Sequence, residues 1–384
     1  MDLPAEIIGI IVAYIAGYDA IYCFGVGLSH IDSIPMHDLA SLRLVNKTFC
    51  YFASKHFFRI LSWGGGLWDE ICYSPYAVHV RQMHLIGPDH GSERMSWEKL
   101  TIQLPDVLSC LPHLETMVVH LEVLSTSDLE AINPQRVLVQ SFEKAPLLKL
   151  RNLLVFFDGL KAYKAGTLRE AVTPKKQVTR LLQGLRRLSL QSPDAMVPDT
   201  WTKAQSLAAD FLACLLNLPE TSATQPAPEA EDGVKQDMSQ GSSTLELELL
   251  ALAELAVPGS VPATFATLAT QSLRHFDMHR VLLVSGNWCD ILLSLSHMPQ
   301  LVKFRLKRCK QWEMGSDRQL ICVNLVPAPG VKAEVDECDY EAPLACLPLE
   351  LGLAYVAALR QVNVNRSSAG MTPLWHQGKW WTCQ

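Results

Sequence analysis

The sequence lacks most of the features that mark secreted, membrane-spanning and nucleic-acid-binding proteins. Its 11 cysteines are an odd number and form no C-x-x-C pair, so we expect buried, reduced thiols and no disulfide framework. The formal net charge is −6, which leaves no broad basic field to attract nucleic acid. No stretch is long and apolar enough to span a bilayer, so we expect no membrane partner.

The apolar segment 7–18 has the composition of a signal peptide but not its flanks. No Lys or Arg precedes it, and Asp2 and Glu6 carry the wrong charge for that role. Together with the cysteine usage, this favours a soluble protein of the cytoplasm, the nucleus or both.

Motifs for catalysis and cofactor binding are also missing. Gly64-Gly65-Gly66 lacks the Lys-Ser/Thr of a phosphate-binding loop, and no G-x-S-x-G occurs. His275 and His279 fall on a predicted strand, where two histidines are more often structural than metal ligands. Four cysteines are spread too widely for the usual zinc spacings: Cys309, Cys322, Cys338 and Cys346. We therefore expect no catalytic residue, cofactor or metal, and a protein that is not an enzyme.

What the sequence does contain is a globular composition, 49% hydrophobic and 19% charged over 384 residues. Its first sixty residues predict three helices. We expect Asp2 to cap the first, in which apolar residues recur at helical spacing: Leu3, Ile7, Ile8, Ile11, Tyr14 and Ile15. Because this helix keeps almost no polar face, it needs cover on most sides.

The second predicted helix starts at Asp38 as its N-cap and runs through Phe49. Its apolar stripe consists of Leu39, Leu42, Val45 and Phe49. Arg43 and Lys47 lie four residues apart on another face, where two like charges favour contact with solvent or a partner. The segment 52–61 is expected to form the third helix.

Both halves of this region resemble an F-box domain. Leu3-Pro4-Ala5-Glu6-Ile7-Ile8 resembles the family's opening, L-P-x-E-[IL]-[IL], and residues 38–49 resemble its second half, D-L-x-x-L-R-L-V-x-K-x-F. Ala53-Ser54 and Phe58-Arg59 resemble the continuation A-S-x-x-x-F-R that is common in filamentous-fungal F-box proteins. The first half alone is a weak signal, since Leu347 begins another L-P-x-E-L that we interpret as an ordinary helix start.

The resemblance implies that these helices bind the Skp adaptor of an SCF (cullin-RING) ubiquitin ligase. The adaptor contacts that it implies are Leu3, Pro4, Ile7, Ile8, Ile11, Leu39, Leu42, Val45 and Lys47. A three-helix module is also too small to bury so apolar a first helix by itself. One departure from the family is a long inserted loop, residues 17–36, which could obstruct the adaptor surface. The alternative is that these helices only cap the domain that follows.

The rest of the chain repeats one pattern. Residues 108–119 and 295–306 both read L-x-x-[LM]-P-x-L-x-x-[MF]-x-[VL], which predicts a helix, a proline break and a strand. Weaker strand copies are predicted at 150–157, 185–190, 245–250 and 273–278, with another helix at 211–218. Helix, break and strand make one unit of a leucine-rich-repeat-like solenoid, whose units must stack to bury their apolar faces.

The predicted fold class is therefore α/β: a small, all-helical F-box at 1–62 followed by an irregular leucine-rich-repeat-like solenoid at 63–370. We expect Gly64–Gly66 to form a hinge and 220–243 a disordered insertion. The tryptophan-containing segment 371–384 forms either a cap on the last repeat or a tail whose exposed tryptophans bind a partner. The predicted function is substrate recognition in an SCF ubiquitin ligase, with an unknown target protein on the repeats. The alternative function is a repeat scaffold that does not engage a ubiquitin ligase.

Overall fold

The computed structural model describes residues 3–16, 36–63, 73–86, 97–122, 134–145, 147, 149–158, 184–191, 245–312, 320–325 and 349–372. The chain divides into two compact units, Met1–Gly159 and Leu160–Gln384, and each is described by itself. Both contain helices and parallel strands, so the predicted α/β class is confirmed.

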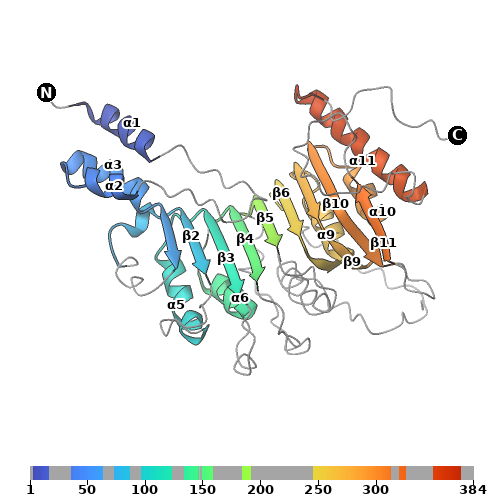
Figure 1. Cartoon of the computed structure of the whole chain (residues 1–384), viewed down its shortest axis with the longest axis horizontal. Coiled ribbons are helices and arrows are strands. Elements are labelled where there is room, and N and C mark those ends of the chain that lie inside the picture. The colour runs from blue at the N-terminus through green and yellow to red at the C-terminus, as the bar shows by residue number, and fades with distance from the viewer. Residues whose placement is uncertain are drawn as a thin grey trace, which may run out of the picture. The chain divides into compact units, whose positions relative to one another are not determined.

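Three helices begin the first unit: α1 (Ala5–Ile15), α2 (Met36–Leu42) and α3 (Lys47–Phe57). Both α1 and α2 pack against α3 (Figure 1). Their shared core consists of Ile8, Val12, Leu39 and Ala53, with Leu42 and four other partly buried apolar residues around it.

The prediction of one continuous helix from Asp38 through Phe49 is wrong. Helix α2 ends at Leu42, and Asp38 lies in its first turn instead of capping it. A second helix begins at Lys47, because Asn46 has extended backbone and its Oδ1 accepts a hydrogen bond from the Phe49 N–H over 2.9 Å. Asparagine is among the strongest N-cap residues, so this local bond outweighs the helical spacing of the apolar residues.

The sheet of the first unit consists of four parallel strands in chain order: β1 (Ile60–Trp63), β2 (Gln82–Ile86), β3 (Thr116–Glu122) and β4 (Asn152–Asp158). The short 3-10 helix η2 (Ala77–His79) precedes β2, while α5 (Trp97–Ser109) and α6 (Pro134–Lys144) connect the later strands (Figure 1). One row of strand side chains, Met83, Met117 and Leu153, is fully buried.

In the second unit, β5 (Arg187–Gln191), β6 (Leu249–Ala253), β8 (His275–His279) and β10 (Lys303–Trp312) are parallel neighbours. Their buried row is Leu188, Leu250, Phe276 and Phe304. Helices α9 (Ser260–Leu268) and α10 (Trp288–Leu295) lie between successive strands along the chain. Strand β11 (Leu320–Leu325) pairs antiparallel with β10.

Two strands of this unit are interrupted. Strand β6 is followed by β7 (Ala256–Pro258), and β8 by β9 (Leu282–Ser285). The breaks fall at Glu254 and Arg280, whose φ angles are 57° and 54°. Beyond the breaks the parallel pairing resumes: β7 pairs with β9, and β9 pairs with the second half of β10.

The two helix–break–strand predictions are confirmed. Helix α5 ends at Ser109, one turn follows, and β3 starts at Thr116. Likewise, α10 ends at Leu295 and β10 starts at Lys303. The strand predicted at 245–250 lies later than expected, at Leu249–Ala253. Before it, the carbonyl oxygens of Leu245 and Leu247 accept hydrogen bonds from the Ser272 hydroxyl.

A long helix, α11 (Leu349–Ser368), begins at the second L-P-x-E-L segment, where an ordinary helix start was predicted. It packs against α10, and Asn365 Nδ2 donates to the carbonyl oxygens of Met298 and Leu301, each at 2.8 Å. These bonds satisfy backbone groups in the turn between α10 and β10. Several predicted features lie outside the described residues: most of the loop 17–36, the Gly64–Gly66 hinge, the helix at 211–218, the insertion 220–243 and the tail beyond residue 372.

Candidate functional site

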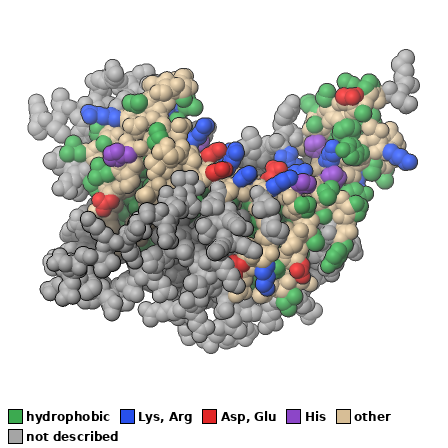
Figure 2. Space-filling view, turned by 180° about the vertical axis from the view of Figure 1, so that it is seen from behind, with side chains coloured by type: hydrophobic (Ala, Val, Ile, Leu, Met, Phe, Trp, Pro, Cys, Tyr) green, Lys and Arg blue, Asp and Glu red, His purple; other side chains and the backbone are tan. Residues whose placement is uncertain are grey.

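The N-terminal helices expose an unusual amount of apolar surface. Leu3, Ile7, Ile10 and Tyr14 are 53%, 42%, 65% and 77% exposed, although they belong to α1 or directly precede it. Only Ile8 and Val12 of this helix are buried. Figure 2 shows hydrophobic side chains gathered over this part of the molecule, at the upper right. A contiguous apolar patch of this kind marks an interaction surface in a soluble protein.

A second exposed apolar pair lies in the turn between α2 and α3. Leu44 is 87% exposed and Val45 is 61% exposed. This turn exists because α2 stops at Leu42 and Asn46 caps α3, which leaves the two side chains outside any helical stripe. We use the name apolar face for these two exposed groups taken together: Leu3, Ile7, Ile10 and Tyr14 of the first, and Leu44 and Val45 of the second.

The nine predicted adaptor contacts divide into three groups. Ile8 and Leu39 are 5% and 0% exposed and help to form the core of the three helices. Ile11 and Leu42 are partly buried. The remaining five are exposed: Leu3, Pro4, Ile7, Val45 and Lys47.

The motif comparison missed three residues of the apolar face. Ile10, Tyr14 and Leu44 were not among the nine, although each is exposed. Sequence reasoning had a signal for Ile10, which extends the apolar surface around the side of α1. It had none for Leu44, because that residue looked like part of a continuous helix.

Arg43 does not face solvent or a partner as predicted. Its Nε donates to the Ser54 Oγ over 3.1 Å, and its guanidinium carbon lies 4.6 Å from the centre of the Phe58 ring. The rings of Phe57 and Tyr76 lie within 5.3 Å of the same carbon. A planar guanidinium stacks well on aromatic faces, so Arg43 ties the turn to α3 and to the segment before β2.

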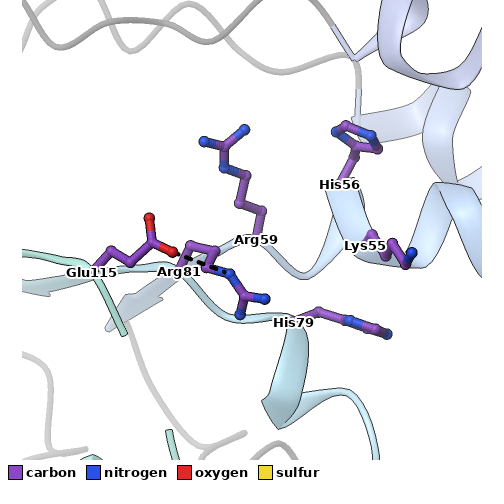
Figure 3. Close-up of a pocket in the computed structure, with 6 residues that line it drawn as sticks. All are labelled: Lys55, His56, Arg59, His79, Arg81 and Glu115. Carbon is purple, nitrogen blue, oxygen red and sulfur yellow. Dashed lines mark ion pairs between the residues drawn. The ribbon is translucent and has the colours of Figure 1, made fainter. Parts of the chain in front are cut away.

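A second candidate site is a pocket of about 360 Å³ in the first unit (Figure 3). Its lining side chains are Lys55, His56, Arg59, His79, Arg81 and Glu115. Arg81 Nε lies 3.5 Å from the Glu115 carboxylate. Burial lowers the pKa of His79 from its ordinary value, and the charges of Lys55 and Arg81 lower it further.

The residues considered for metal binding give no site within the described residues. His275 and His279 lie at the two ends of β8, as the strand prediction requires. Burial and three nearby cations lower the pKa of His275 from its ordinary value. Where the structure describes the chain, no group of three His, Cys, Asp or Glu side chains could hold a metal ion. Cys309 is a buried thiol whose Sγ lies 3.4 Å from the Met278 carbonyl oxygen, as predicted for a cysteine of the core.

Comparison of the chain with models of known protein families and with curated proteins finds no match. Among the described residues, no helix has both the length and the apolar character needed to cross a bilayer. The functional argument therefore rests on the geometry of this chain, and above all on the apolar face.

Proposed function

We propose that the chain is a substrate-recognition subunit of an SCF (cullin-RING) ubiquitin ligase. In this proposal α1, α2 and α3 form an F-box that binds a Skp adaptor through the apolar face. The exposure of that face is the observation that carries the proposal, because water is an unfavourable environment for Leu3, Ile7 and Ile10.

The free energy gained by burying these side chains in a complex is large enough for binding. Full burial of one exposed Leu or Ile side chain stabilises a complex by about 1.5–3 kcal/mol. Several such side chains at the centre of an interface can supply most of the binding free energy, so the polar residues around them need to contribute little. The buried Ile8 and Leu39 act indirectly here, because they hold α1 and α2 against the shared core.

The remainder of the chain is proposed to be the leucine-rich-repeat-like region that binds the target protein. Successive parallel strands joined by helices support this, since one helix–strand unit cannot bury its own apolar face. The chain then supplies binding surfaces only, transfer of ubiquitin belongs to other subunits, and the complex works in the cytoplasm, the nucleus or both.

Co-expression with a Skp adaptor tests the proposal. The native chain is expected to co-purify with the adaptor, and the double substitution Leu3→Asp, Ile7→Asp is expected to abolish this, because it places two charges in the apolar face. Ile102→Asp is the matched control, since Ile102 is 72% exposed on α5, away from the three helices. A native chain that fails to co-purify, or a double variant that binds as well as the control, contradicts the proposal.

The alternative of a repeat scaffold without a ligase requires α1 to be covered by the domain that follows. Of the side chains expected to separate the two functions, Ile7 is exposed, whereas Ile11 and Leu42 are partly buried. Ile10 and Tyr14 of the same helix are exposed as well. The exposure of Ile7, Ile10 and Tyr14 favours the ligase adaptor.

A further inference from the structure

The pocket between the end of α3 and the starts of the strands gathers positive charge in an otherwise acidic protein. Lys55 and His56 come from the last turn of α3, His79 from η2, and Arg59 and Arg81 from the residues directly before β1 and β2. The whole chain has a formal net charge of −6, so this local excess of cations does not follow from composition.

The parallel register explains why these groups meet. Ile60, Gln82 and Thr116 are aligned across β1, β2 and β3. The residues just before them, Arg59, Arg81 and Glu115, therefore occupy the same place on three adjacent strands, about 5 Å apart. The backbone confirms this alignment, because the Arg81 N–H donates to the Arg59 carbonyl oxygen over 2.9 Å.

The Arg81 side chain is held in position before any ligand arrives. Its Nη1 donates to the carbonyl oxygens of Val78 and Val80, at 2.7 Å and 3.2 Å, while Nε faces Glu115. Figure 3 shows its guanidinium extending toward His79. A guanidinium fixed in this way loses little conformational entropy when it binds an anion.

The helix end accounts for only part of the charge. Cations in the last turn of α3 interact favourably with the helix dipole, which is sufficient reason for Lys55 and His56. The helix dipole gives no reason for Arg59 and Arg81, which directly precede β1 and β2. Among the described lining residues, cations therefore outnumber carboxylates: Lys55, Arg59 and Arg81 against Glu115.

We propose that this pocket binds a small ligand through a phosphate monoester or diphosphate group. A phosphate monoester carries a charge between −1.5 and −2 at neutral pH and three acceptor oxygens, so it can contact several cationic side chains at once, which a singly charged carboxylate does less well. Guanidinium and ammonium groups are the usual partners of phosphate oxygens. The Arg81 guanidinium is already held in place, whereas the Lys55 Nζ, 4.1 Å from the centre of the Tyr51 ring, turns to the ligand on its flexible stem. A volume of about 360 Å³ lies at the lower end of small-molecule sites. This inference goes beyond the proposed ligase function and does not depend on it.

Calorimetric titration of the full chain with glycerol phosphate and with pyrophosphate, at low ionic strength, tests the proposal. We expect saturable binding of at least one probe at one site per chain, and the tighter probe identifies the phosphate class. Lys55→Gln and Arg81→Gln are each expected to weaken binding by roughly 10-fold or more. Lys144→Gln, at an exposed lysine of α6, is the charge-matched control and should leave the Kd unchanged.

Absence of saturable binding to the native chain overturns the proposal. So does an equal loss of affinity in Lys144→Gln, which would show a response to net charge alone. Because Arg81 also supports the surrounding backbone, Lys55→Gln is the decisive variant, and it must retain the circular dichroism spectrum of the native chain. Adaptor binding by Lys55→Gln is expected to be unchanged, which separates this test from that of the ligase function.

Discussion

Arg280 Nη1 donates to the Glu254 carboxylate over 3.1 Å, and both residues have left-handed backbone, with φ of 54° and 57°. They hold equivalent places in the breaks of two neighbouring strands, since Ala253 aligns with His279 and Ala256 with Leu282. The pair is partly buried, with 28% and 12% of the side chains exposed. The ion pair thus joins two strained positions that sequence patterns do not reveal.

Replacing Arg280 separates its two contributions. Arg280→Ala loses the ion pair and keeps the backbone strain, whereas Arg280→Gly loses the ion pair and relieves the strain. We expect both to destabilise the protein, and Arg280→Gly to be more stable than Arg280→Ala by about 1 kcal/mol. Urea denaturation of the two variants and the native chain measures this difference. Equal or lower stability of the glycine variant would refute the argument from strain.

Arg43 is expected to stabilise the N-terminal helices through its stack on aromatic rings. Arg43→Lys keeps the charge but loses the flat guanidinium, so we expect it to cost about 1–2 kcal/mol, close to the effect of Arg43→Ala. Hydrogen exchange of the α3 amides, followed by mass spectrometry, reports the local loss of stability. Lys47→Ala at the exposed start of α3 is the control. Full retention of protection in Arg43→Lys would show that only the charge matters.

His84 should make the stability of the first unit depend on pH. Burial, with a smaller contribution from His120, lowers the pKa of His84 to about 4, whereas an unfolded histidine has a pKa of about 6.5. The unfolded chain therefore binds more protons between these pH values, so stability falls as the pH decreases through the window. His84 alone is expected to cost about 2 kcal/mol between pH 7 and pH 5.

The measurement is the free energy of unfolding at pH 7 and pH 5 for the native chain and for His84→Leu. The variant should lose less stability on acidification than the native chain, whatever its stability at pH 7. Identical losses in the two proteins would mean that folding does not lower the pKa of His84.

Local sequence patterns predicted the helices and strands of this fold better than the breaks between them. The helix, break and strand around Leu111–Pro112 and Met298–Pro299 follow from apolar spacing and proline, which act within a few residues. The break before Asn46 was missed because a capping side chain competed with an equally good helical stripe. The breaks at Glu254 and Arg280 were missed because left-handed backbone usually selects glycine or asparagine, and neither is present.

The two candidate sites also differ in how far the sequence could predict them. The motif of the first fifty residues predicted much of the apolar face, since Leu3, Ile7 and Val45 follow from neighbouring positions in the chain. The basic pocket could not be predicted, because Arg59 and Arg81 are separated by a segment whose pairing only the parallel register reveals. Cations that are distant in the sequence become one site only because β1 and β2 of the first unit lie side by side.

The central claim is that the apolar face binds a Skp adaptor, and an equilibrium binding measurement with purified proteins tests it most directly. The Kd for the adaptor should increase by at least about 100-fold on Leu3→Asp, Ile7→Asp. Burial of the two half-exposed side chains contributes about 1.5–3 kcal/mol, and burial of the two new carboxylates adds a further cost. Ile102→Asp should bind like the native chain. Saturable binding by the native chain and the control, with its loss in the double variant, is the predicted result. No binding by the native chain, or unchanged affinity in the double variant, would contradict the account.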